Sequence, residues 1–159
     1  MMFNINDNRR YAMLFDPKRE RDFLINGSWE IVDDKQNFSL LLDNSKPAWV
    51  NLLLTAKRPT DDQTGQNLTV RICVQSYGSD TNPIRMIGEK FQINYVSSSA
   101  NKLTGDTVEY EISLKIPPES LMAGMHYLYP QIQAESDGED LGIVCKGRHV
   151  AVQVLDITY

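Results

Sequence analysis

The chain has 159 residues, of which 42% are hydrophobic and 23% are charged, as in a globular domain long enough to build a core. Its net charge of −5 argues against nucleic acid as a partner, because binding to phosphates needs clustered Lys and Arg. The apolar runs are only a few residues long, so no membrane span is expected. The first residues lack the basic, apolar and small-residue order of a signal peptide, which makes the cytoplasm the expected compartment.

The chain is predicted to form one domain with an N-terminal extension. Residues 22–159 are predicted to form a single β-sandwich domain, for which the strand patterns are given below. Residues 1–21 give mixed signals and are expected to be an arm that packs on this sandwich. Within the arm, residues 11–15 fit either a short strand or one turn of helix, and Asp16-Pro17 marks a turn after them. Both interpretations of residues 11–15 stay open.

The first hairpin signal follows the arm. Residues 23–25 and 29–32 are apolar enough for two strands, and Asn26-Gly27 lies between them. This dipeptide tolerates the positive φ angles of a tight turn, so we expect a hairpin that reverses at Asn26 and Gly27.

Two apolar runs of strand length come next, at residues 38–42 and 49–54. Their nearly continuous apolar character predicts central strands that are covered on both faces, or that use one face against another subunit. Trp49, in the second run, is expected to fill the core, as a buried Trp does in many sandwiches.

Alternation between apolar and polar residues marks the other strands, because successive side chains of a strand point to opposite faces. It is clean in residues 68–74, 108–116 and 150–154 and weaker in residues 84–95. With turn signals at short intervals and no convincing helix, the chain is predicted to be an all-β, antiparallel β-sandwich of about nine to ten strands, immunoglobulin-like or jelly-roll.

A corner motif precedes the C-terminal strands. Pro117 and Pro118 cannot donate ladder hydrogen bonds, so the strand before them must end. The following Leu121-Met-Ala-Gly124-Met-His-Tyr127 resembles the corner between the E and F strands of an immunoglobulin-like or fibronectin type III sandwich, in which a Tyr hydroxyl bonds back to the corner backbone. The resemblance implies a fold and not a function, because this sandwich carries many unrelated functions.

The strand after the corner departs from that pattern, because Tyr127 shares its face with polar and aromatic residues while the opposite face is apolar. The first face carries Tyr127, Tyr129, Gln131 and Gln133, and the second carries Leu128, Pro130, Ile132 and Ala134. Either the corner residue is His126, which is in phase with Leu128, or a bulge near Pro130 shifts the register.

The sequence contains no catalytic or metal-binding signature. Cys73 and Cys145 match no zinc or redox spacing and are predicted to be free thiols, with a disulfide between them as the alternative if the protein is secreted. His126 and His149 are interpreted as structural, since a nucleophile–base pair needs spatial contact and an orienting group. Loop carboxylates follow turn geometry rather than a spaced calcium motif. We therefore predict no enzyme activity, no cofactor and no metal.

One strand face is the candidate interaction surface. Tyr127, Tyr129, Gln131 and Gln133 mix rings with amides on that face, which is more typical of a binding surface than of a core. Trp29 is a further candidate, because exposed rings stack on sugars and are enriched at protein interfaces.

Two binding functions are compatible with these patterns. The first hypothesis is a non-enzymatic interaction module that associates with another protein or with its own copy through a sheet face, because residues 40–42 and 52–54 supply a surplus of apolar side chains. The alternative is a carbohydrate-binding β-sandwich module, resembling the sandwich domains appended to polysaccharide enzymes and exporters.

Overall fold

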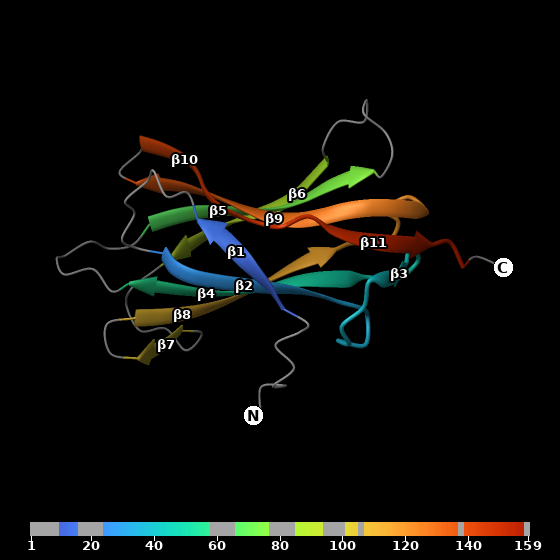
Figure 1. Ribbon diagram of the computed structural model, residues 1–159, viewed down its shortest axis with the longest axis horizontal. Coiled ribbons are helices and arrows are strands. Elements are labelled where there is room, and N and C mark those ends of the chain that lie inside the picture. Colours follow the sequence, from blue (N-terminus) through green and yellow to red (C-terminus); the bar gives the residue numbers. More distant parts are fainter. Residues whose placement is uncertain are drawn as a thin grey trace.

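The computed structural model is a two-layered β-sandwich, with the strands of the two layers stacked one above the other in Figure 1. The structure describes residues 10–15, 24–57, 66–76, 85–93, 101–104, 107–136 and 139–157. These residues form eleven strands and no helix, so none of them forms a helix that could span a membrane. The predicted all-β sandwich class is confirmed.

The lower layer in Figure 1, sheet A, is antiparallel throughout. In spatial order it contains β1 (Tyr11–Phe15), β2 (Leu24–Val32), β4 (Ala48–Lys57), β8 (Thr107–Ile116) and β7 (Asn101–Thr104).

The upper layer, sheet B, is organised around its central strand, β9 (Gly124–Ser136). On one side, β5 (Gln66–Ser76) pairs with β9 and then with β6 (Arg85–Ile93). On the other side, β10 (Glu139–Gly147) and β11 (Val150–Leu155) pair with successive parts of β9.

One pairing corrects the expectation of an entirely antiparallel sandwich. The short strand β3 (Leu41–Asp43) runs parallel to β11. The chain leaves sheet A after β2, pairs in sheet B as β3, and returns to sheet A as β4. Because β3 and β11 lie at distant places in the chain and no hairpin turn joins them, the pair is not forced to be antiparallel.

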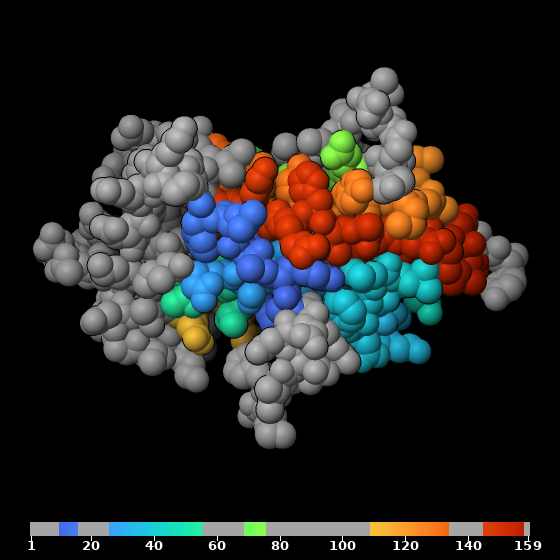
Figure 2. Space-filling model, in the orientation of Figure 1, coloured from blue at the N-terminus to red at the C-terminus, as the bar shows by residue number. Residues whose placement is uncertain are grey.

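The first strand belongs to both sheets. Tyr11 and Ala12 pair with β2, whereas residues 13–15 pair with β10. Figure 2 shows the dark blue atoms of β1 between the red C-terminal segment and the lighter blue atoms of β2. Residues 11–15 are therefore a strand and not a helical turn. The rest of the expected arm, residues 1–9 and 16–21, lies outside the described residues, and the domain boundary stays a prediction.

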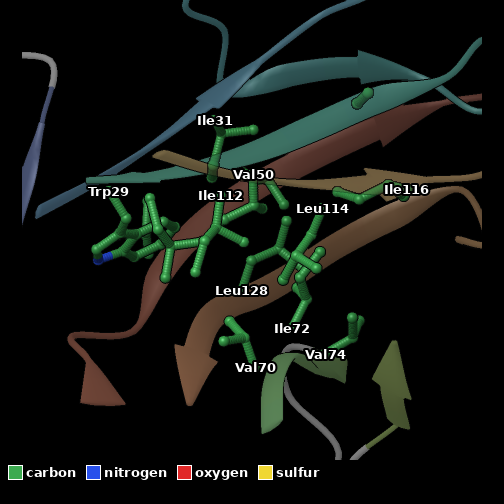
Figure 3. Packing of buried hydrophobic residues seen from close by; sticks show 14 of the residues in the cluster. Trp29, Ile31, Val50, Val70, Ile72, Val74, Ile112, Leu114, Ile116 and Leu128 are labelled. Carbon is green, nitrogen blue, oxygen red and sulfur yellow. The ribbon is translucent and has the colours of Figure 1, made fainter. Parts of the chain in front are cut away.

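The inner faces of the two sheets form one core, whose side chains point toward each other in Figure 3. The alternation is clear in β8, where Ile112 and Leu114 are buried while Glu111 and Lys115 are exposed. Burial of each large apolar side chain stabilises the fold by about 1.5–3 kcal/mol. The strands predicted at residues 108–116 and 150–154 are confirmed.

The predicted hairpin at Asn26-Gly27 is wrong, because β2 runs through both residues without reversing. Pairing with β4 shifts by one residue between Leu24 and Asn26, so a bulge takes the place of the turn. A Cβ on Gly27 would lie 2.9 Å from Met13 Cγ and 3.0 Å from Leu54 Cδ2. The glycine therefore serves close packing inside a strand.

The two apolar runs also differ from expectation. Residues 38–42 supply only the short edge strand β3, in which Leu42 is buried and Leu41 is 52% exposed. In β4, Leu52 and Leu54 point into the core, but Trp49 is only half-buried on the other face. The buried tryptophan is Trp29, which is 0% exposed, because it pairs in register with Leu52 and shares the inward phase.

Candidate ligand-binding face

The corner that leads into β9 is closed by a histidine. After Pro117 ends β8, the chain reaches β9 at Gly124, whose φ is +130°. His126 is buried, and its Nε2–H donates to the Met122 carbonyl at 2.7 Å. Pairing of β5 with β9 continues without a shift past Pro130. Of the two alternatives, the structure has His126 at the corner and keeps the register of β9 against β5.

The opposite phase of β9 lies on the outer face of sheet B, where the strand register aligns side chains in rows across the strands. The described rows are Thr69–Gln133, Arg71–Gln131–Lys146, Cys73–Tyr129 and Gln75–Tyr127–Ala151. These residues come from β5, β9, β10 and β11, which lie side by side in the upper layer of Figure 1.

An aromatic cluster lies in the middle of this face. The His149 ring stacks on Tyr129, with centroids 4.0 Å apart and an interplanar angle of 17°. Tyr127 lies next to the same imidazole at 6.1 Å, tilted by 45°. Tyr129 is only 6% exposed, whereas Tyr127 is half-buried and His149 is exposed. Any ligand that reaches the cluster will therefore meet His149 and Tyr127 first.

Both members of the ring stack are held in their neutral forms near neutral pH. Burial, followed by the neighbouring Cys73, raises the pKa of Tyr129. Burial, followed by the positive charge of Lys146, lowers the pKa of His149. A neutral, stacked pair of rings offers an apolar surface rather than a fixed charge.

Polar side chains surround the rings. Arg71 Nη1 donates to Gln133 Oε1 at 2.7 Å, which joins β5 to β9 on the outer face. Gln131 lies between Arg71 and Lys146 in its row, and Gln75 lies opposite Tyr127. The face therefore combines rings with amides, which both donate and accept hydrogen bonds, and with cations, which donate them.

Both cysteines are free and buried. Burial raises the pKa of the Cys145 thiol to about 12 and also raises the pKa of Cys73. Since the thiolate is the reactive form, both thiols are poor nucleophiles where they stand. Among the residues that the structure describes, no group of three His, Cys, Asp or Glu side chains could hold a metal ion.

The sequence-predicted site residues fall into two places. Tyr127, Tyr129, Gln131 and Gln133 lie along one strand on the outer face of sheet B. Trp29 does not join them, because it is fully buried beneath β10, where a Cβ on Gly147 would clash with its indole Nε1.

Sequence reasoning missed three members of this face, namely Arg71, Lys146 and His149. Arg71 reaches Gln133 from a position 62 residues away in the chain. The alternation around residues 68–74 places Arg71 on a polar strand face, but only the pairing of β5 with β9 identifies which partners it meets.

Comparisons with known proteins support the fold. No protein-family model and no curated protein sequence matches the chain. The crystal structure of the C-terminal domain of wzt is similar with a TM-score of 0.56 at 12% identity, over 99% of this chain and 89% of that one. At this identity the likeness shows a shared β-sandwich fold and nothing about ligands.

A second solved structure, a β-glucosidase from Listeria innocua in complex with glucose, aligns with 82% of this chain and 16% of its own. Its TM-score is 0.41 at 10% identity, which is too low to support an argument about fold or function.

Proposed function

We propose that the protein is a non-enzymatic binding module whose outer face of sheet B binds a glycan. The observation that carries the proposal is the ring stack of Tyr129 and His149 with Tyr127 beside it, in a field of amide side chains. Rings supply flat apolar contact for the C–H face of a sugar, and amides supply directed hydrogen bonds for its hydroxyl groups. The immunoglobulin-like or fibronectin type III affiliation stays a prediction.

The arrangement suits an extended ligand. Tyr127, Tyr129, Gln131 and Gln133 occupy successive same-face positions of β9, each about 6.8 Å from the next along an antiparallel strand. The Tyr129 ring is 6% exposed and stacks on the imidazole of His149, so its position is fixed before a ligand arrives. A preorganised surface loses little side-chain entropy on binding.

A binding role is also supported by the state of the nucleophilic groups. Both thiols are buried with raised pKa values, and the His126 ring is engaged in the corner through Met122. These groups stabilise the fold, and a catalytic role would require them to face a substrate.

A glycan array tests the proposal. We expect binding that falls about tenfold or more in His149→Ala and Tyr127→Ala, because the sugar ring loses the aromatic surface on which it packs. Trp49→Ala, which removes a half-buried ring from the outer face of sheet A, is the matched control and should leave binding unchanged. Absence of binding to every glycan on the array would overturn the proposal.

Protein association is the second candidate, and its original motivation has changed. Leu42, Leu52 and Leu54 are buried in the protein's own core, so Leu41 is the exposed residue of these two runs. Leu41, at 52%, lies near the corner end of sheet B with two further exposed apolar side chains, Met122 at 73% and Met125 at 41%.

Solution mass from light scattering over a dilution series tests that candidate. A dimer that dissociates in Met122→Ser with Met125→Ser would support association through the corner end. A monomer at all concentrations, together with a pull-down that captures no protein, would overturn the association candidate.

A further inference from the structure

One row of side chains crosses the outer face of sheet B beside the aromatic cluster. Arg71 on β5 lies opposite Gln131 on β9, which lies opposite Lys146 on β10. Because neighbouring strands are about 4.8 Å apart, the backbones of the two basic residues are separated by roughly 10 Å. The row therefore holds a positive charge on each side of one amide.

The described side chains of this row and of the rows beside it include no carboxylate, and the next position of the same phase on β9 after Gln133 is Glu135. Arg71 donates at 2.7 Å to Gln133, whose amide oxygen is neutral. The salt bridge found among described residues joins Arg10 to Glu30 on the other sheet. No carboxylate occurs in the four rows of described side chains, although acidic residues outnumber basic ones by 21 to 16 in the whole chain.

The row and the aromatic cluster are close enough to contact one ligand. Lys146 stands near the end of β10, three residues before His149, and its positive charge contributes to the lowered pKa of His149. Gln131 and Tyr129 are neighbouring same-face positions of β9, about 6.8 Å apart along the strand. A ligand that stacks on His149 can extend one step along β9 and reach the cations.

We propose that the outer face of sheet B selects an acidic glycan, with a sugar carboxylate between Arg71 and Lys146 and a neighbouring sugar ring against His149 and Tyr127. This inference rests on the glycan binding proposed above. The Arg guanidinium binds carboxylates through paired N–H groups. The Lys ammonium adds a second positive charge and does not need a fixed orientation. A sugar fits this face better than an acidic peptide, because its C–H face packs flat on the rings. Its hydroxyl groups can then bond to the amides that follow the rings along β9.

The experiment compares acidic glycans with their carboxyl-reduced counterparts, in which each uronic acid has become the neutral sugar of the same stereochemistry. The array carries such pairs, and an acidic peptide series is included. We expect binding to acidic members at least tenfold tighter than to their reduced partners, and weaker binding as NaCl is raised.

Two substitutions locate the effect. Arg71→Gln and Lys146→Gln should each lower the ratio of acidic to carboxyl-reduced binding about tenfold, because each removes a charge that the carboxylate uses more strongly than a neutral sugar does. Lys115→Gln, an exposed cation on the outer face of sheet A, is the control and should change neither. Thermal melts of all three variants verify that each is folded.

The outcomes separate this inference from the proposed function. Equal binding of acidic and reduced members, unchanged in Arg71→Gln and Lys146→Gln, would overturn the acidic selectivity and leave glycan binding standing. Binding to the acidic peptides alone, or to nothing on the array, would overturn both. Tight binding of acidic members that none of the three substitutions weakens would also overturn the inference, because it would place the anion elsewhere.

Discussion

The outer faces of the two sheets follow the same strand alternation but satisfy their polar groups differently. On sheet A, Arg10 contacts Ser28 at 2.8 Å and Glu30 at 3.4 Å. Asn51 donates to Glu30 at 3.4 Å and accepts from Ser113 at 2.6 Å. In this network the positive charge of Arg10 is paired with the negative charge of Glu30, and the polar side chains bond to one another, as expected for a solvated surface.

Sheet B is packed on its outer face as well as on its inner one. Tyr129 is 6% exposed and Cys73 is 0% exposed, although both belong to the outward phase of their strands. His149 stacks on Tyr129, and the described side chains in the rows of Tyr129, Gln131 and Gln133 include no carboxylate. The difference teaches that the outward phase of a strand can still hold buried rings, so burial cannot be read from alternation alone.

The largest expected effect is on the free energy of unfolding, when a tryptophan on the inner face of sheet A is replaced rather than one on its outer face. Trp29→Ala should lower the free energy of unfolding by about 3–5 kcal/mol, because it opens a cavity in the core. Trp49→Ala, on the outer face, should cost below about 2 kcal/mol. Urea unfolding measures both. Equal losses would mean that the outer face of sheet A is as well packed as the core.

The next effect compares the two outer faces directly. Tyr129→Ala should lower the free energy of unfolding by about 2–3 kcal/mol, because its ring is covered by His149. Leu53→Ala, half-buried on the outer face of sheet A, should cost about 1 kcal/mol. Urea unfolding of both variants, with Tyr129→Phe as the control that keeps the ring, provides the test. If Leu53→Ala were the more costly, the contrast between the faces would fail.

The corner should have a smaller effect. His126→Phe keeps a ring of similar shape but loses the Nε2–H that donates to the Met122 carbonyl, so the expected cost is about 1 kcal/mol. Thermal and urea unfolding measure it, and glycan binding should be unchanged because His126 points inward. Loss of binding with full stability would contradict the inward placement of this histidine.

The smallest effect is a pH dependence from the ring stack. Burial and Lys146 lower the pKa of His149 below its ordinary 6.5, so the unfolded chain takes up a proton before the folded protein does. Stability contributed by the neutral ring is then complete above pH 6.5 and is lost as the pH falls below it.

Unfolding free energies of the wild type and His149→Gln, measured between pH 7 and pH 5, test this sign. The wild type should lose more stability on acidification than the variant. A wild type that became relatively more stable at low pH would show that His149 is stabilised as a cation, which would change the chemistry of the face.

Much of the strand layout follows from local patterns. The alternation in β8 and β11 and the stop at Pro117 are encoded by neighbouring residues, and they are seen where they were predicted. Four residues of the candidate face were also predicted, because Tyr127 to Gln133 share one phase of a single strand. The prediction of a turn at Asn26-Gly27 was wrong, because the packing of Gly27 against Met13 and Leu54 overrides the local turn preference.

By itself, the sequence determined the strand periodicity and therefore the fold class, since side-chain alternation and proline chemistry act over a few residues. Only the tertiary structure decided that Trp29 rather than Trp49 fills the core, that β1 pairs with both sheets, and that His126 closes the corner. It also decided the row of Arg71, Gln131 and Lys146, because strand order and register bring together residues far apart in the chain. Periodicity assigns each side chain to a face, and pairing across the sheet assigns it its neighbours.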